Sequence, residues 1–219
     1  MFPLETFSYF EIQAFITALI FLAFSRDKVL RWFPVYLFFI LAVELSARYI
    51  RKVHHEPNVW IYNLSIPVEY LFYSWVFYMH FHSAAIRRYT RWFIIAFGAF
   101  VVVNLTLLQG LGKYNSHSVL IGSVSMILLS AYTLFELYNQ DQEYQVWAVP
   151  LFWIATGVLL FNAGEFAYNL FSNYLVNAGF DDAAKFFASI NNTFLIPILY
   201  YCLTIGFICT RMIQIYKRD

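Results

Sequence analysis

Charged residues are scarce in this chain of 219 residues. Lys, Arg, Asp and Glu together make up 12% of it, whereas roughly a quarter of the residues in a soluble domain are charged. Apolar residues account for 61% and aromatic residues for 22%. This composition excludes an ordinary soluble domain and predicts an integral membrane protein.

Long polar segments are also missing. Seven apolar blocks follow one another with short connections, and each is near the ~20 residues that a membrane-spanning helix needs. The blocks cover residues 6–25, 33–52, 59–80, 92–111, 118–138, 151–173 and 187–211. We predict an all-α transmembrane bundle of seven helices, forming one domain over residues 1–219 with no soluble domain. Six helices are the alternative, because the third and seventh blocks contain proline and polar residues.

Several kinds of chemistry lack the residues that they need. The two cysteines, Cys202 and Cys209, both fall in the seventh block, and we interpret them as small apolar residues without a disulfide or metal role. The five histidines divide between the two predicted faces of the membrane, which opposes a zinc site. No G-x-S-x-G or H-E-x-x-H motif occurs. We therefore predict no metal, no cofactor and no common hydrolase chemistry.

The basic residues are too few and too evenly spread to indicate a nucleic-acid partner, since the net charge is only +1. Their distribution favours an N-terminus outside and a C-terminus in the cytoplasm. That orientation places the larger group inside (Arg26, Lys28, Arg31, Arg87, Arg88, Arg91, Arg211, Lys217 and Arg218) and the smaller group outside (Arg48, Arg51, Lys52, Lys113 and Lys185). The N-terminal sequence "MFPLETFSYF" has no basic region or cleavage site, so we expect the first helix to be retained.

Glutamates inside the apolar blocks each need an explanation, because an acid at the centre of a membrane helix costs about 2.5–3.5 kcal/mol on insertion scales. Glu136 and Glu11 lie near the ends of their blocks, where a carboxylate reaches the interface. Glu44 precedes Arg48 by four residues, the spacing of a helical ion pair, and we predict that these two form a structural pair.

Glu69 and Glu165 lie nearer the middle of their blocks. Tyr62 shares a helical face with Glu69, while Asn162 and Asn169 share one with Glu165. Asparagines also open the third and seventh blocks on the predicted outer side. The sequence thus predicts an outward-facing polar cavity that binds a ligand through Tyr62, Asn63, Glu69, Asn162, Glu165, Asn169, Asn191 and Asn192. The alternative, left open here, is that these groups only hydrogen-bond helices to one another, for about 0.6–2 kcal/mol each.

A weak internal similarity links "NLSIPVEYLFYSWVFY" of the third block with "NTFLIPILYYCLTIGF" of the seventh. The preceding blocks carry Glu44 and Glu165 in "ELSARYI" and "EFAYNLF". Blocks one to three and five to seven would then be parallel three-helix repeats, as in some transporters, but the first and fifth blocks show no comparable match.

The stretch "PLFWIATGVLLFNAGEFAYNLF", followed by "INNTFLIPILYYCLTIGF", resembles small bacterial polytopic membrane proteins. The resemblance covers about the last third of the chain. It implies the class and a bacterial cytoplasmic membrane, and it implies no activity.

The functional hypothesis from the sequence is a membrane sensor or accessory subunit that binds a small or lipidic ligand. Its expected partners are membrane lipids and a protein on the cytoplasmic face, near Arg87, Arg88 and Arg91. A proton-coupled transporter of small solutes is the first alternative. A lipid-modifying enzyme acting through Glu69 or Glu165 is the second.

Overall fold

The structure is a computed structural model that describes residues 6–23, 25–140, 145–177, 182, 186 and 189–216; for residues 172–177 and 212–216 it describes the backbone alone. Seven long helices make up this part of the chain, which contains no strand. They are α1 (Thr6–Leu22), α2 (Phe33–Tyr49), α3 (Val59–His80), α4 (Ala84–Val103), α5 (Ser116–Asn139), α6 (Pro150–Asn177) and α8 (Ile196–Tyr216). The all-α prediction is confirmed.

Within the described residues, five helical segments are long and apolar enough to cross a membrane: Leu30–His54, Ala84–Leu108, Ser116–Asn139, Pro150–Phe171 and Asn191–Arg211. α1 is apolar but shorter, and α3 is continuous through Pro67 despite its polar residues. The side chains that point outward are largely apolar; Phe38, Trp92 and Leu128 are 63%, 63% and 64% exposed. An exterior of this kind suits hydrocarbon, so the chain is a membrane protein.

The fourth helix begins earlier than the sequence predicted. We expected a block over residues 92–111, whereas α4 begins at Ala84, where the hydroxyl of Ser83 accepts a hydrogen bond from the backbone N–H of Ile86. A serine in this position satisfies a backbone N–H that the first turn leaves unpaired. The arginines before residue 92 therefore extend the helix and do not delay its start.

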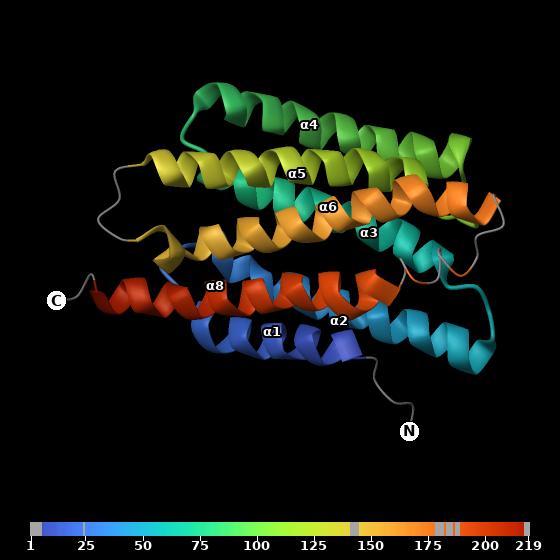
Figure 1. The fold of residues 1–219 in the computed structure, drawn as a ribbon, viewed down its shortest axis with the longest axis horizontal. Helices are drawn as coiled ribbons and strands as arrows, with labels where there is room; N and C mark the ends of the chain where they lie inside the picture. Colours follow the sequence, from blue (N-terminus) through green and yellow to red (C-terminus); the bar gives the residue numbers. More distant parts are fainter. Residues whose placement is uncertain are drawn as a thin grey trace.

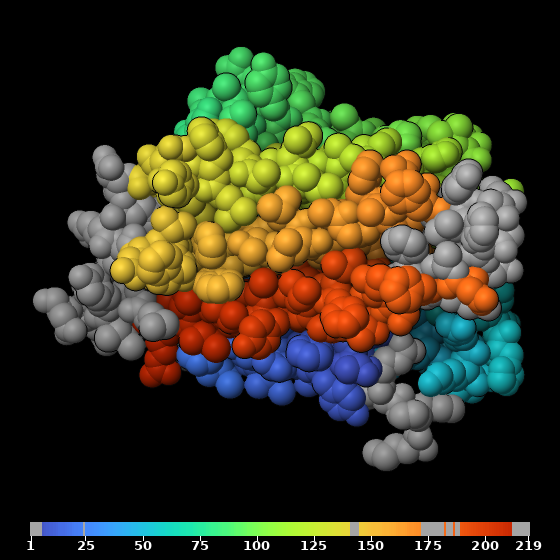
Figure 2. All heavy atoms as spheres, in the orientation of Figure 1, coloured from blue at the N-terminus to red at the C-terminus, as the bar shows by residue number. Residues whose placement is uncertain are grey.

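Six of the helices form a closed ring. In order of contact around the ring they are α1, α2, α3, α5, α6 and α8, and α8 returns to α1. The seventh helix, α4, lies outside the ring against α3 and α5 (Figure 1). Figure 2 shows one face of the ring, on which α8 lies between α6 and α1.

The helices run along the long axis of the molecule, and α1 begins at the opposite end of the bundle from the end at which α8 finishes (Figure 1). We call the end at which α1 begins the N-end, and the end at which α8 finishes the C-end. α2, α4 and α6 finish at the N-end, while α3, α5 and α8 begin there. The side of the membrane that each end faces stays a prediction.

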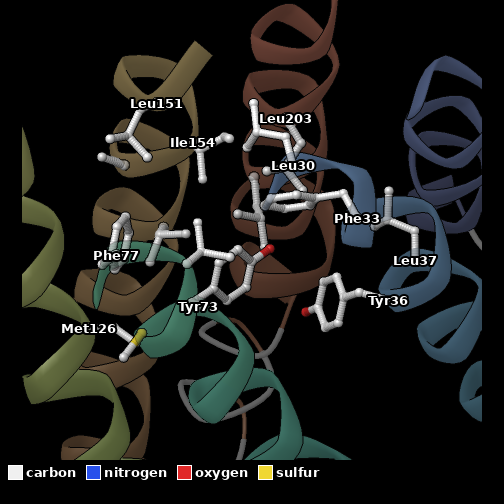
Figure 3. Packing of buried hydrophobic residues seen from close by; sticks show 14 of the residues in the cluster. Leu30, Phe33, Tyr36, Leu37, Tyr73, Phe77, Met126, Leu151, Ile154 and Leu203 are labelled. Carbon is white, nitrogen blue, oxygen red and sulfur yellow. The ribbon is translucent and has the colours of Figure 1, made fainter. Parts of the chain in front are cut away.

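An aromatic cluster fills the ring between its two ends. Phe33 and Phe207 are fully buried, with ring centroids 5.2 Å apart, and Tyr36 stacks on Phe72 at 4.1 Å. Figure 3 shows Phe33, Tyr36 and Tyr73 close to one another, with Leu203 and Ile154 nearby on the two helices opposite. We call Phe33, Tyr36, Tyr73, Phe77 and Phe207 the aromatic plug.

Close helix contacts elsewhere in the ring depend on glycine. A Cβ added at Gly157 of α6 would lie 2.8 Å from the Cβ of Cys202 on α8. Small residues let membrane helices approach closely, and the gain is van der Waals packing between their backbones. Cys202 is buried at this contact, which suits the small apolar role predicted for it.

Candidate functional site: a polar cavity at the N-end

A cavity of about 620 Å³ lies inside the ring at the N-end. All of its carboxyl groups come from helices of the ring: Glu11 from α1, Glu44 from α2, Glu69 from α3 and Glu165 from α6. The other lining residues are Phe7, Ile40, Val43, Arg48, Arg51, Lys52, Asn58, Val59, Tyr62, Ser65, Ile66, Tyr114, Phe161, Asn191, Asn192, Ile196, Leu199 and Tyr200. The size falls within the roughly 300–1,000 Å³ that is usual for small-molecule sites.

Charge in the cavity is ordered by depth. Arg48 ends the last turn of α2, and Arg51 and Lys52 follow it in the short π-helix η2 (Ile50–His54), at the N-end. Glu69 lies ten residues into α3, about 15 Å further along the bundle at 1.5 Å per residue. The rim is therefore basic and the interior acidic.

Two π-helical segments contribute to the rim. η2 provides Arg51 and Lys52, and η5 (Asn191–Leu195), which leads into α8, provides Asn191 and Asn192. A π-helical turn widens the helix and re-aims its side chains, and such turns are frequent at functional sites. Pro197 follows closely after this segment, inside a continuous helical run, where a proline removes one backbone hydrogen bond.

Glu165 is held by two amide side chains. The Nδ2 of Asn191 donates to its Oε1 at 2.5 Å, and the Nδ2 of Asn169 donates to its Oε2 at 2.8 Å. The first bond joins α6 to the start of the last helix, and the second spans one turn of α6. Both carboxyl oxygens are thus satisfied, although the residue still lines the cavity.

The Glu44 carboxyl lies between α2 and α3. Its Oε2 is 3.8 Å from the Nε of Arg48, at the spacing of four that the sequence indicated, and it accepts a hydrogen bond from the hydroxyl of Tyr62 at 3.3 Å. Arg48 also donates to the hydroxyl of Ser8 at 2.5 Å and lies over the ring of Phe7. Arg48 therefore ties α2 to α1 at the rim of the cavity.

Glu11 is the least compensated acid. The sequence favoured an interfacial position, but the residue is only 3% exposed and lines the cavity. Its Oε2 has no hydrogen-bond partner among the described residues. The Tyr200 hydroxyl donates a hydrogen bond to the Glu11 carboxyl, as the Tyr36 hydroxyl does to Glu69. The physical reason for the difference is that α8 covers this face of α1, which keeps Glu11 away from the interface.

The predicted site residues divide into two groups. Tyr62, Glu69, Glu165, Asn191 and Asn192 meet around the cavity, although they come from three different parts of the chain. Asn63, Asn162 and Asn169 are not among its lining residues. Asn169 contacts two lining residues, Glu165 and Tyr114, without lining the cavity itself.

Asn63 stabilises the connection before α5. It is fully buried, its Nδ2 donates to the carbonyls of Leu111 and Lys113, and its Oδ1 accepts from the N–H of Asn115. Asn162 is buried as well and donates to the Val158 carbonyl of its own helix. These two asparagines satisfy the protein's own backbone, which is the alternative that the sequence left open for them.

Sequence reasoning missed Glu11, Tyr200, Arg51 and Lys52 as lining residues. A position near a block end indicates an interface when one helix is considered alone. The only available signal was the coincidence of polar residues near the N-end of several blocks, and it does not say which helices are neighbours.

A second, smaller pocket of about 360 Å³ lies at the C-end. Its polar lining includes Asp27, from the connection between α1 and α2, and His80, the last residue of α3. The Nε2 of His80 is 2.8 Å from Oδ2 of Asp27, and its Nδ1 is 2.7 Å from the carbonyl oxygen of Val76. Because both neighbours are acceptors, both ring nitrogens carry hydrogen and the two side chains form an ion pair.

The surroundings of Asp27 favour its ionised form. Burial alone would raise the pKa of this carboxyl, but the hydrogen bond and charge of His80 and the backbone N–H groups of Val29 and Leu30 together lower it below 3.8. His82 and Glu136 form a second, longer contact in this pocket, 3.9 Å between Nδ1 and Oε2. Asp27 and Glu136 at the C-end thus each have a histidine imidazole within 3.9 Å.

No group of three or more His, Cys, Asp or Glu residues suited to a metal ion occurs in the described part of the chain. Compared with family models, with curated proteins and with solved structures, the chain matches none of them. The functional argument consequently depends on the geometry of this molecule alone.

Proposed function

We propose that this membrane protein binds a small or lipidic ligand in the N-end cavity and acts as a sensor or accessory subunit through a partner. The observation that supports the proposal most directly is the convergence of Tyr62, Glu69, Glu165 and Asn191, from α3, α6 and η5, on one cavity of about 620 Å³. Polar groups that only join helices would leave no space between them.

The lining supports the same conclusion. Ile40, Ile66, Phe161, Ile196 and Leu199 give the cavity apolar walls between the polar groups. Ligand sites commonly combine mostly apolar walls with a few polar groups that fix orientation. An outward-facing mouth follows if the N-end faces outside, as the distribution of Lys and Arg predicts.

Native mass spectrometry of the protein in lipid nanodiscs tests the proposal. We expect the wild type to retain a bound molecule that the cavity-filling variant Ile66→Trp loses, because Ile66 lines the cavity. Val68→Trp, on the exposed face of the same helix, is the matched control and should retain the molecule. Identical bound species in all three proteins would contradict the proposal.

A transporter is the second candidate, and the order of helices in the ring favours it. The ring contains α1, α2 and α3 followed by α5, α6 and α8, so two sets of three helices follow one another around it in chain order while α4 stays outside. This is the arrangement that parallel three-helix repeats would produce. The C-end pocket supplies a space on the other side of the aromatic plug.

One-sided labelling separates the two candidates. A cysteine replacing Ser65, which lines the cavity, is exposed in sealed vesicles to a membrane-impermeant thiol reagent added from either side. Reaction from the N-end side alone favours the ligand-binding sensor. Reaction from both sides favours alternating access, and a proton-dependent solute flux lost in Glu165→Gln would support the transporter further.

A further inference from the structure

Among the described lining residues, the interior of the N-end cavity holds more negative than positive groups. Glu11, Glu69 and Glu165 lie below the rim, and the charge of Arg48 acts on Glu11 without a direct ion pair between the two. Arg48 is already held by Glu44, Ser8 and the ring of Phe7. Carboxyl groups in a low-dielectric interior are costly unless a cation or a set of donors compensates them.

Glu11 shows most clearly that a compensating group is missing. It is 97% buried, since 3% of its surface is exposed, it lines the cavity, and its Oε2 has no hydrogen-bond partner among the described residues. Glu165 differs because both of its oxygens accept amide hydrogen bonds. Glu11 is thus a lining residue of a space large enough for a ligand, and one of its carboxyl oxygens is an unused acceptor.

The rim has the opposite character. Arg51 is exposed on η2 and Lys52 follows it, both lining the mouth of the cavity. A molecule entering from the N-end first meets these bases and then, further along the bundle, the acids. Aromatic groups of Tyr62, Phe161 and Tyr200 stand beside the acids and can face a cation with their π surfaces.

Building on the ligand-binding function proposed above, we propose that the cavity takes an amphoteric amine: a protonated amino group bound by Glu11 and Glu69, and an anionic group bound at the rim by Arg51 and Lys52. A free amino acid or amino phosphate has this chemistry, and so does the ethanolamine headgroup of a phospholipid. The ammonium donates to carboxyl oxygens, and the opposite ends of the ligand match the ordered charges of the cavity.

The charge preference of the cavity can be measured with two thiol reagents. Ser65→Cys is made in a Cys202→Ala, Cys209→Ala background and treated with an aminoethyl (cationic) or a sulfonatoethyl (anionic) methanethiosulfonate. The rate at which each reagent modifies Ser65→Cys is divided by the rate at which it modifies His117→Cys, an exposed position at the same end of the bundle. We expect the cationic reagent to be favoured by about tenfold after this correction, as in clefts lined by one sign of charge.

If the proposal is right, Glu11 and Glu69 cause the preference for the cationic reagent. Glu11→Gln with Glu69→Gln should abolish it, whereas Glu136→Gln, at the C-end, should leave it unchanged. If the two reagents modify Ser65→Cys at equal corrected rates while all the glutamates are present, the amine proposal is overturned, although the cavity is still accessible. If neither reagent reaches Ser65→Cys while His117→Cys reacts, the ligand-binding function itself fails, so the two failures are distinguishable.

Protection by candidate ligands then tests the anionic end and identifies its source. O-phosphoethanolamine should slow the cationic reagent at Ser65→Cys more than propylamine does, and Arg51→Gln with Lys52→Gln should remove the difference. Slower reaction in phosphatidylethanolamine than in phosphatidylglycerol nanodiscs would assign the site to a lipid headgroup. Protection by the soluble compound alone would assign it to a free amine, and protection by neither would overturn the proposed ligand class.

Discussion

The acidic side chains at the two ends of the ring differ in how completely the protein provides them with hydrogen-bond and ion-pair partners. At the C-end, Asp27 is paired with His80 and accepts two backbone N–H groups, and Glu136 has His82 beside it. At the N-end, Glu165 is held by amides, and Glu11 has an oxygen without a partner in the described structure. The C-end pocket therefore satisfies its own charges, whereas the N-end cavity leaves acceptor capacity for something else.

The comparison separates a pocket whose charged groups are paired within the protein from a cavity that has acceptors left for a ligand. Both ends contain a space lined by ionisable groups, and the aromatic plug lies between them. The distinguishing property is how far the protein compensates the charges that it buries. Four substitutions test this comparison, in order of decreasing expected effect.

Removing the barrier between the two ends should have the largest effect. Phe207→Ala deletes a fully buried ring that packs against Phe33, and we expect a loss of about 3–5 kcal/mol in the free energy of unfolding. Denaturation by sodium dodecyl sulfate in mixed micelles measures it. Phe38→Ala, at a position 63% exposed, is the control and should cost less than about 1 kcal/mol. Similar losses would mean that the plug is not a packed barrier.

Replacing Glu165, the N-end acid whose two oxygens accept amide hydrogen bonds, should have the next largest effect on stability. Glu165→Gln places an NH₂ group against one of the two amide donors, so we expect a loss of about 1–3 kcal/mol. The same denaturation assay in an Asn191→Ala background is the control. There the cost should shrink, because the bond between the two residues is already absent. An unchanged cost would contradict the contact between α6 and η5.

The C-end ion pair should contribute a smaller, pH-dependent amount. Asp27→Asn should cost about 1 kcal/mol at neutral pH, a modest value because the Asp27 side chain is 34% exposed. A carboxyl whose pKa is lowered on folding stabilises the protein above its unfolded value of 3.8, and this stability is lost as the pH falls through the folded value. Melting temperatures of both proteins should therefore converge below pH 3.8. A constant difference from pH 7 to pH 3 would refute the assignment.

Neutralising the uncompensated acid should have the smallest effect. Glu11→Gln removes a charge whose Oε2 has no partner, so we expect a change within about 0.5 kcal/mol, or a gain in stability. The measurement is the denaturation assay used for Glu165→Gln, and the two values are compared directly. A loss as large as that of Glu165→Gln would show that Glu11 is structural and would remove the contrast between the acids.

Local spacing predicted some parts of the candidate site well. The four-residue separations of Glu44 from Arg48 and of Glu165 from Asn169 correspond to contacts within one helix. Such contacts depend only on helical geometry, which the sequence reveals. Contacts between helices were not predictable in this way. Asn191 reaches Glu165 across 26 positions, and His80 reaches Asp27 across 53.

Asn63 and Asn192 illustrate the same limit. Both open a helix at the N-end, and a single sequence gives no reason to treat them differently. The structure places Asn192 at the cavity and Asn63 against the connection before α5. Which neighbour faces a side chain decides its role, and that depends on how the ring closes.

The sequence by itself determined that this chain is a helical membrane protein, because the scarcity of charge and the length of the apolar blocks leave backbone groups no partner except their own helix. Only the tertiary structure decided that α4 stands outside a ring of six helices and that Glu11, Glu69 and Glu165 meet around one cavity. The reason is physical. Burial and charge compensation belong to the space between helices, and that space exists only after the ring has closed.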